Sequence, residues 1–127
     1  MGVDIYADHP VEWEKAELYK KLERELGFTG LRGFRSVGRK LFHKDGVVTD
    51  IETGETVDVG WVDVLESTTG CDFQELRIVR GIEPDMLWRW LVHALRKQRD
   101  VGLTPPEAKV LRFLEIIADH EGELSIA

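Results

Sequence analysis

The chain has 127 residues, of which 43% are hydrophobic and 32% charged, and its formal net charge is −7. This composition is too apolar for an intrinsically disordered chain and predicts one globular domain over residues 1–127. A single cysteine, Cys71, excludes an intrachain disulfide. No run approaches the roughly 18 apolar residues of a membrane span, and the N-terminus has no basic, apolar leader. We therefore expect a cytoplasmic protein without a membrane partner.

The first predicted elements are a short strand over residues 3–6 and a helix. Asp8 or His9 is a candidate cap for this helix, which runs to about Leu26 and ends at Gly27. Apolar residues at helical spacing predict its buried side, formed by Val11, Leu18, Leu22 and Leu26. After it, residues 28–46 contain several glycines. The pattern is compatible with a short helix from about Phe34 to His43 or with an irregular loop.

Residues 47–80 predict an antiparallel meander of three strands. Polar and apolar residues alternate over 47–52 and, after a turn, up to residue 65. The alternation changes phase at Gly60–Trp61, where we expect a bulge. The third strand is predicted over 73–80.

Two helices follow the meander. The first runs from Pro84 to about Asp100, and the second begins at Thr104, with Glu107 at the spacing of a capping box. In the first, Leu87, Leu91, Ala94 and Leu95 are predicted to point inward, with Trp88 and Val92 on a neighbouring face. Because so wide a sector is apolar, we expect this helix to be packed centrally. In the second, the buried side is predicted to hold Val110, Leu114, Ile117 and Ala118.

These elements predict the α+β class. We expect a small, mostly antiparallel sheet, built from the N-terminal strand and the 47–80 meander. The N-terminal helix and the two C-terminal helices pack with it. Residues 124–126 are a candidate for a last strand at the edge of the sheet.

The charge of the chain is segregated along the sequence. Residues 27–44 contain five cations and no acid, whereas residues 45–75 contain nine acids and neither Lys nor Arg. Net charge informs about partners and solubility rather than about fold. A segregated charge therefore suggests a polar surface that a partner recognises.

The basic segment offers Arg32, Arg35, Arg39 and Lys40 as candidate binding residues. If the segment is helical, the three arginines project from one face and can bind phosphates or carboxylates. With phenylalanines between them they also suit single-stranded nucleic acid. We favour a third interpretation, in which the arginines pair with the acidic segment of the same chain.

The acidic segment offers Asp50, Glu52 and Asp58. Carboxylates about 7 Å apart along a strand approximate the spacing of nucleic-acid phosphates, so that a decoy of a nucleic acid can be built this way. The alternative, which we favour, is the solvent face of a hairpin whose charge protects an edge against aggregation.

Neither a metal, a cofactor nor a catalytic group is predicted. The four histidines are not paired at helical spacing, and Cys71 lies beside Asp72, an acid that raises rather than lowers the pKa of a thiol. Residues 103–114 resemble the first helix of helix-turn-helix regulators. A DNA-reading unit needs a second helix, and the net charge opposes DNA binding, so sequence-specific DNA recognition is disfavoured.

The first six residues, Met1-Gly2-Val3-Asp4-Ile5-Tyr6, resemble the start of small uncharacterised proteins encoded by bacteriophages and mobile elements. The resemblance implies an accessory origin, in which small acidic proteins often act by binding and blocking a host protein. It transfers no functional residue.

We interpret the sequence as that of a non-enzymatic binding or regulatory protein. It contacts another macromolecule, and we favour a protein over single-stranded nucleic acid, through its segregated basic and acidic surfaces. A phage-type inhibitor and a nucleic-acid mimic are versions of this hypothesis, with Trp13 or another exposed aromatic residue as the anchor. The alternative is a small enzyme or ligand-binding domain that uses Arg35 or His93 toward an anionic small molecule. Homodimerisation is left open.

Overall fold

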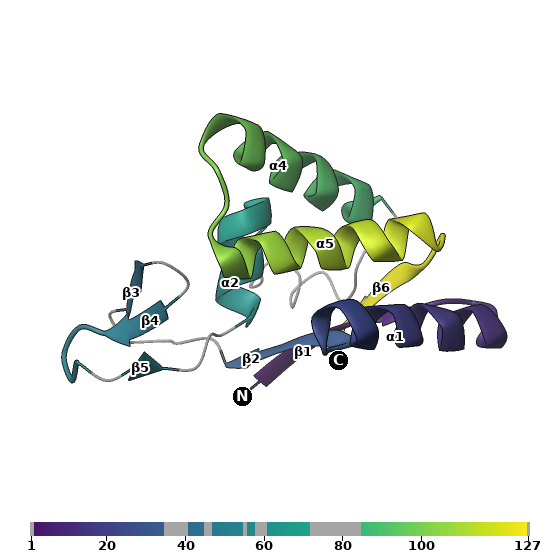
Figure 1. The fold of residues 1–127 in the computed structure, drawn as a ribbon, viewed down its shortest axis with the longest axis horizontal. Helices are drawn as coiled ribbons and strands as arrows, with labels where there is room; N and C mark the ends of the chain where they lie inside the picture. Colours follow the sequence, from purple (N-terminus) through teal and green to yellow (C-terminus); the bar gives the residue numbers. More distant parts are fainter. Residues whose placement is uncertain are drawn as a thin grey trace.

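A computed structural model describes residues 2–34, 41–44, 47–54, 56–57, 61–71 and 85–126. The fold belongs to the α+β class, as predicted (Figure 1). Its elements in chain order are β1 (Gly2–Asp8), α1 (Glu12–Leu26), β2 (Gly30–Phe34), β3 (Leu41–Lys44), β4 (Val47–Asp50), β5 (Thr56–Val57), α2 (Trp61–Thr69), α4 (Met86–Asp100), α5 (Pro105–Asp119) and β6 (Glu123–Ile126).

The N-terminal strand β1 is the centre of an antiparallel sheet with the order β2-β1-β6. Ile5 is opposite Leu31 in β2 and Ile126 in β6. Ile5 and Ala7 are buried, as expected of alternate residues that share one face of a strand. The predicted strands at both ends of the chain are thus confirmed, and β6 is an edge strand of this sheet.

A second antiparallel sheet has the order β3-β4-β5. Its β4–β5 pair confirms the first turn of the predicted meander. The single sheet that we expected is wrong, because β1 pairs with β2 and β6 instead of with this hairpin.

The short helix predicted from Phe34 to His43 is also wrong at both of its described ends. Phe34 is the last residue of β2, where it pairs with Gly2, and His43 lies in β3, where it pairs with Val48. Residues 35–40 lie outside the described residues. Strand pairing, with β1 for Phe34 and with β4 for His43, has overridden the local helical spacing.

Helix α2 replaces the end of the second strand of the predicted meander. We expected strand to residue 65 with a bulge at Gly60–Trp61, but Trp61 begins a helix. The buried residues of α2 are two adjacent pairs, Val64 with Leu65 and Thr68 with Thr69, and their separation of four residues is that of a helix face. A short apolar run fits either period, which explains the error. The third strand, predicted over 73–80, lies outside the described residues.

Helix α1 ends as predicted and begins differently. Gly27 has a φ of 80°, a left-handed conformation that glycine adopts without strain. The predicted cap is wrong, because α1 starts after Val11 and no side chain caps it. The predicted buried side is correct except at that residue: Leu18 and Leu22 are buried, Leu26 is half-buried and Val11 is exposed.

His9 joins the start of α1 to the end of α5 instead of capping a helix. Its ring is buried, and Nδ1 accepts a hydrogen bond from the N–H of Val11 at 3.0 Å. Because a backbone amide only donates, the ring proton belongs on Nε2. Nε2 lies 3.1 Å from the carbonyl oxygen of His120 and 2.9 Å from a carboxylate oxygen of Glu14.

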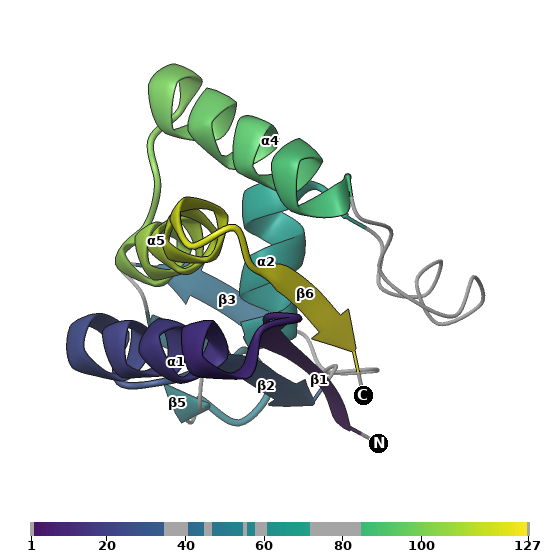
Figure 2. The ribbon, with the colours of Figure 1, turned by 90° about the vertical axis from the view of Figure 1, so that its right-hand side faces the viewer.

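The most deeply buried helix is α5. The capping box predicted at its start is present, with Thr104 and Glu107 bonded reciprocally, and Val110, Leu114 and Ile117 are buried. The fourth residue of the predicted buried side, Ala118, is half-buried. In Figures 1 and 2, α5 lies between α4 and α1, so the centre of the fold is α5 rather than the helix before it.

An ion-pair cluster joins α1 to α5. Glu25 accepts hydrogen bonds from Arg112 at 2.9 and 3.2 Å, and its carboxylate lies 2.8 Å from Nζ of Lys21. The bonds from Arg112, and then the bond from Lys21, lower the pKa of Glu25 from 4.5 to about 2.

Because the folded state holds this pKa low, Glu25 stabilises the fold above pH 4.5 and loses that contribution as the pH falls toward about 2. We expect Glu25→Gln to flatten the loss of stability over this acidic range. Urea unfolding of the wild type and the variant at a series of pH values measures this loss of stability. The measurement is made at low salt, because Glu25 is partly exposed and salt screens its ion pairs. Parallel curves for the two proteins would contradict the prediction.

Candidate interaction surface

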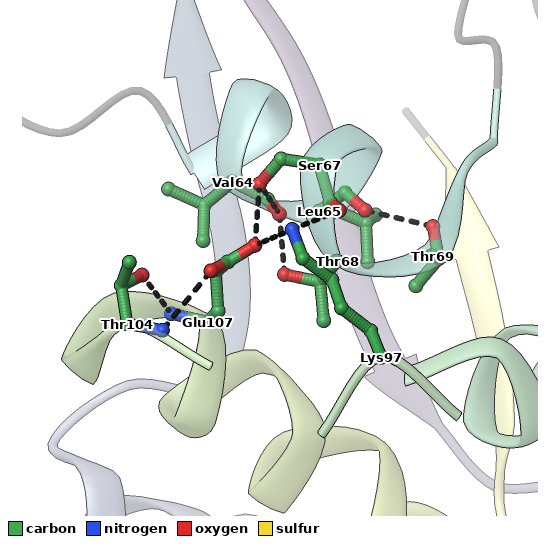
Figure 3. A network of polar contacts seen from close by, with 8 residues as sticks. All are labelled: Val64, Leu65, Ser67, Thr68, Thr69, Lys97, Thr104 and Glu107. Atoms are coloured by element: carbon green, nitrogen blue, oxygen red, sulfur yellow. Dashed lines mark hydrogen bonds and ion pairs between the residues drawn. The ribbon is translucent and has the colours of Figure 1, made fainter. Parts of the chain in front are cut away.

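A polar network fixes α4 to the rest of the fold (Figure 3). Its centre is the buried carboxylate of Glu107 at the start of α5. One oxygen, Oε2, accepts from the hydroxyl of Ser67 in α2 at 3.0 Å and from Nζ of Lys97 in α4. Lys97 also donates to the carbonyl oxygen of Ser67 at 2.8 Å. Three helices therefore meet at one carboxylate.

The same carboxylate completes the capping box of α5. Its other oxygen, Oε1, accepts from the N–H of Thr104 at 3.0 Å, and the Thr104 hydroxyl accepts from the N–H of Glu107 at 3.4 Å. Burial by itself raises the pKa of Glu107. The hydrogen bonds from Lys97, Thr104 and Ser67 outweigh it and lower the pKa below the usual value. Glu107 is therefore an anion at neutral pH.

With Lys97 held inward, the opposite side of α4 faces solvent. The inner side buries Leu87, Trp90, Leu91 and Ala94. The outer side exposes 58% of Trp88, 45% of Val92 and 43% of Leu95. These three residues are spaced i, i+4 and i+7, so they form one apolar stripe along the helix. The predicted inward side is thus confirmed at Leu87, Leu91 and Ala94 and wrong at Leu95. The central packing that we expected of α4 is wrong, because the neighbouring apolar face with Trp88 and Val92 is exposed.

A row of basic side chains runs beside this stripe. Arg89, His93 and Arg96 are all exposed, and the same helical spacing aligns them one position around the helix from the stripe. Arg89 pairs with Asp85 at 3.2 Å, an exposed ion pair of small energetic value. We call the apolar stripe and this row together the α4 face.

The α4 face lies at the periphery of the fold. Figures 1 and 2 both show α4 at the outside of the molecule, with α5 and α2 on its inner side. An exposed tryptophan with two exposed aliphatic neighbours and a basic border has the composition typical of an interaction surface. The sequence contained the signal, since the spacing is visible there, but helical periodicity alone does not distinguish a buried apolar side from an exposed one.

Among the candidate residues of the basic segment, the structure describes only the backbone of Arg32. Arg32 lies in β2, at the position opposite Asp4 of β1. The helical spacing that we proposed for it with Arg35 and Arg39 is therefore wrong at Arg32. Arg35, Arg39 and Lys40 lie outside the described residues.

The acidic candidates do not share a strand. Asp50 is the last residue of β4, and Glu52 lies in the turn that follows, exposed. The row of carboxylates predicted along one strand is thus wrong, because the strand ends before Glu52. Asp58 lies outside the described residues.

The backbone pairing places the two charged segments next to each other. Strand β3 belongs to the basic segment and β4 to the acidic segment, and they pair from Leu41 opposite Asp50 to Lys44 opposite Val47. Neighbouring strands lie about 5 Å apart. Segregation along the sequence therefore does not produce two distant surfaces at this hairpin, although the register sets Lys44 opposite Val47 and Asp50 opposite Leu41 rather than a cation opposite an acid.

Two further candidate residues are exposed without a site around them. Trp13, proposed as an anchor, is 68% exposed on the first turn of α1. His93, proposed for an anionic substrate, lies on the α4 face. Within the described part of the chain, no three His, Cys, Asp or Glu side chains are grouped to hold a metal ion, and no helix has the length and apolarity to cross a membrane.

Comparison of the chain with protein-family models, curated proteins and solved structures gave no match.

Proposed function

We propose that this protein acts by binding another protein and that the α4 face makes the contact. The observation that carries this proposal is the exposed stripe of Trp88, Val92 and Leu95. It lies on a helix whose Lys97 is bonded to α2 and α5. Tryptophan and arginine are the residues most often responsible for binding energy in protein interfaces. In the α4 face, a tryptophan stands beside two arginines.

The network behind α4 supports the proposal from the energetic side. A helix held by a partly buried ion pair, next to a capping box, presents its outer side chains in one arrangement, so little conformational freedom is lost on binding. Such a surface binds as a preformed unit.

Site-specific photo-crosslinking tests the contact. A photoreactive amino acid replaces Val92 at the middle of the stripe, and a second variant carries it at Lys20, an exposed position on α1. In lysate of the source cells we expect one dominant crosslinked protein from position 92 and none from position 20. Equal crosslinking from both positions, or none from position 92 in folded protein, would contradict the proposal.

Trp88→Ala is expected to remove the partner from a pulldown at moderate salt while wild-type protein retains it. The reason is that truncating a central tryptophan of an interface costs on the order of 2 kcal/mol or more, about thirtyfold in affinity. Trp13→Ala provides the matched control, because it removes an equally exposed tryptophan from a different helix. Loss of the partner with Trp13→Ala and its retention with Trp88→Ala would move the interface to α1.

A further inference from the structure

We infer that the segment bound by the α4 face is an acidic amphipathic helix of the partner protein. This inference rests on the proposed function and adds the chemistry of the partner. It follows from the charge of α4, from the backbone chemistry of a helix surface and from the symmetry that a second copy of the chain would have to obey.

The first argument is electrostatic. Helix α4 carries four cations and one acid, in a chain whose net charge is −7. The side chains of Arg96 and His93 form no hydrogen bond or ion pair with other described residues. Arg89 and Arg99 form exposed ion pairs with Asp85 and Asp100, and Lys97 is bonded to Glu107. Arg96 is therefore the cation of α4 that a partner carboxylate can bind without breaking a pair. The α4 face is thus a basic region of an acidic protein, and complementarity favours acids in the partner.

The second argument concerns the conformation of the partner. The backbone N–H and C=O groups of α4 are hydrogen-bonded within the helix, so they cannot pair with the backbone of an extended segment. A strand laid along α4 would leave its own N–H and C=O groups unpaired where it is buried. A helix satisfies these groups internally and places a ridge of side chains against the stripe. The stripe extends over seven residues, about 10 Å, which matches two turns of a partner helix.

The third argument excludes a second copy of the chain as the occupant. In a two-fold symmetric contact, residue i touches residue j and j touches i. Two antiparallel α4 helices that meet at Val92 would place Arg89 near the Arg96 of the other copy. Two parallel helices would bring each arginine close to its own counterpart. Both arrangements bring cations together as the surface is desolvated.

A nucleic acid fits the surface less well than a protein does. The centre of the α4 face is apolar, and the cations lie only beside it, whereas a groove that follows a phosphate backbone is lined with charge. The overall negative charge of the chain adds repulsion.

The test uses designed peptides, because their chemistry is set by choice. One is a helix of about 20 residues with leucines at i, i+4 and i+7 and glutamates beside them. The second has lysine at every glutamate position. Fluorescence anisotropy of the labelled peptides measures the affinity. We expect the acidic peptide to bind at least about tenfold more tightly than the basic one, and Trp88→Ala to weaken its binding by a similar factor.

Charge reversal makes the test specific to the face. The double variant Arg89→Glu with Arg96→Glu is expected to prefer the basic peptide. Its control, Lys20→Glu with Arg24→Glu on the exposed side of α1, makes the same change of charge elsewhere and should keep the wild-type preference. Circular dichroism of each variant confirms that it is folded.

Four results would overturn the inference. They are equal affinity for the two peptides, binding of neither, tighter binding of a single-stranded RNA oligonucleotide that Trp88→Ala abolishes, and a dimer in sedimentation that Trp88→Ala dissociates. If position 92 crosslinks to a protein in lysate while neither peptide binds, the α4 face is an interface and only the acidic helix is wrong. If position 92 captures nothing, the proposed function itself fails.

Discussion

Replacing Glu107 with alanine is expected to lower the free energy of unfolding by about 2–3 kcal/mol. The substitution removes half of the capping box, leaves the N–H of Thr104 without its acceptor and leaves Lys97 with one oxygen partner, the carbonyl of Ser67, instead of two. Lys97 is partly exposed, so water recovers some of the loss, and we place the effect below that of a fully buried pair. Urea unfolding followed by circular dichroism measures it.

The control for this prediction is Glu17→Ala. Glu17 pairs with Lys20 at 3.4 Å on the exposed side of α1, and such a pair contributes no more than about 0.5 kcal/mol. The substitution thus removes a carboxylate that has a cationic partner but is exposed and does not cap a helix. If both variants lose the same stability, the network of Glu107 contributes nothing beyond an ordinary surface ion pair.

Phe113→Ala is expected to cost about 3–5 kcal/mol. Phe113 is fully buried in α5, and its ring lies 5.9 Å from that of Phe28, which in turn lies 5.0 Å from that of Trp61. The truncation leaves a cavity between α5, α2 and the segment before β2, which regular elements cannot close without moving. Chemical unfolding gives the loss directly.

A graded substitution distinguishes the cavity from other causes. Phe113→Leu keeps most of the volume and should cost well under half as much as the alanine variant. Equal losses for the two variants would show that the ring contacts, rather than the volume, carry the stability. A loss below about 1 kcal/mol for alanine would mean that the core closes around the site.

Elements with a local signal could be predicted from the sequence. The end of α1 was marked by Gly27, and the start of α5 by the spacing of Thr104 and Glu107. Each of these signals acts through bonds within one turn of the helix, so neither depends on the rest of the chain.

Elements determined by distant partners could not be predicted in the same way. Phe34 became a strand residue because β1 was available to pair with it, a fact that no local pattern contains. Trp61 begins a helix in a stretch that is too short for its period to be distinguished. Whether Val92 is inside or outside depends on which side of α4 packs against the other helices, and both the buried Leu91 and the ion pair of Lys97 with Glu107 lie on that inner side.

The candidate surface could be predicted in part. The sequence shows an apolar stripe beside arginines in α4, but it shows the segregated charge of residues 27–75 more conspicuously. In the structure, part of that charged region forms the paired strands β3 and β4. The exposed Trp88 belongs instead to α4, the helix that we expected at the centre of the fold.

The position of β1 also has a consequence for how the chain folds as it is synthesised. One edge of β1 pairs with β2, which follows it closely, and the other edge pairs with β6, where Asp8 is opposite Glu123. Until β6 leaves the ribosome, the second edge of the central strand has no partner within the sheet. Contacts between such distant residues form slowly, and an unpaired strand edge is a template for other chains. The nascent protein is therefore exposed to misassociation at this edge of β1 until β6 emerges.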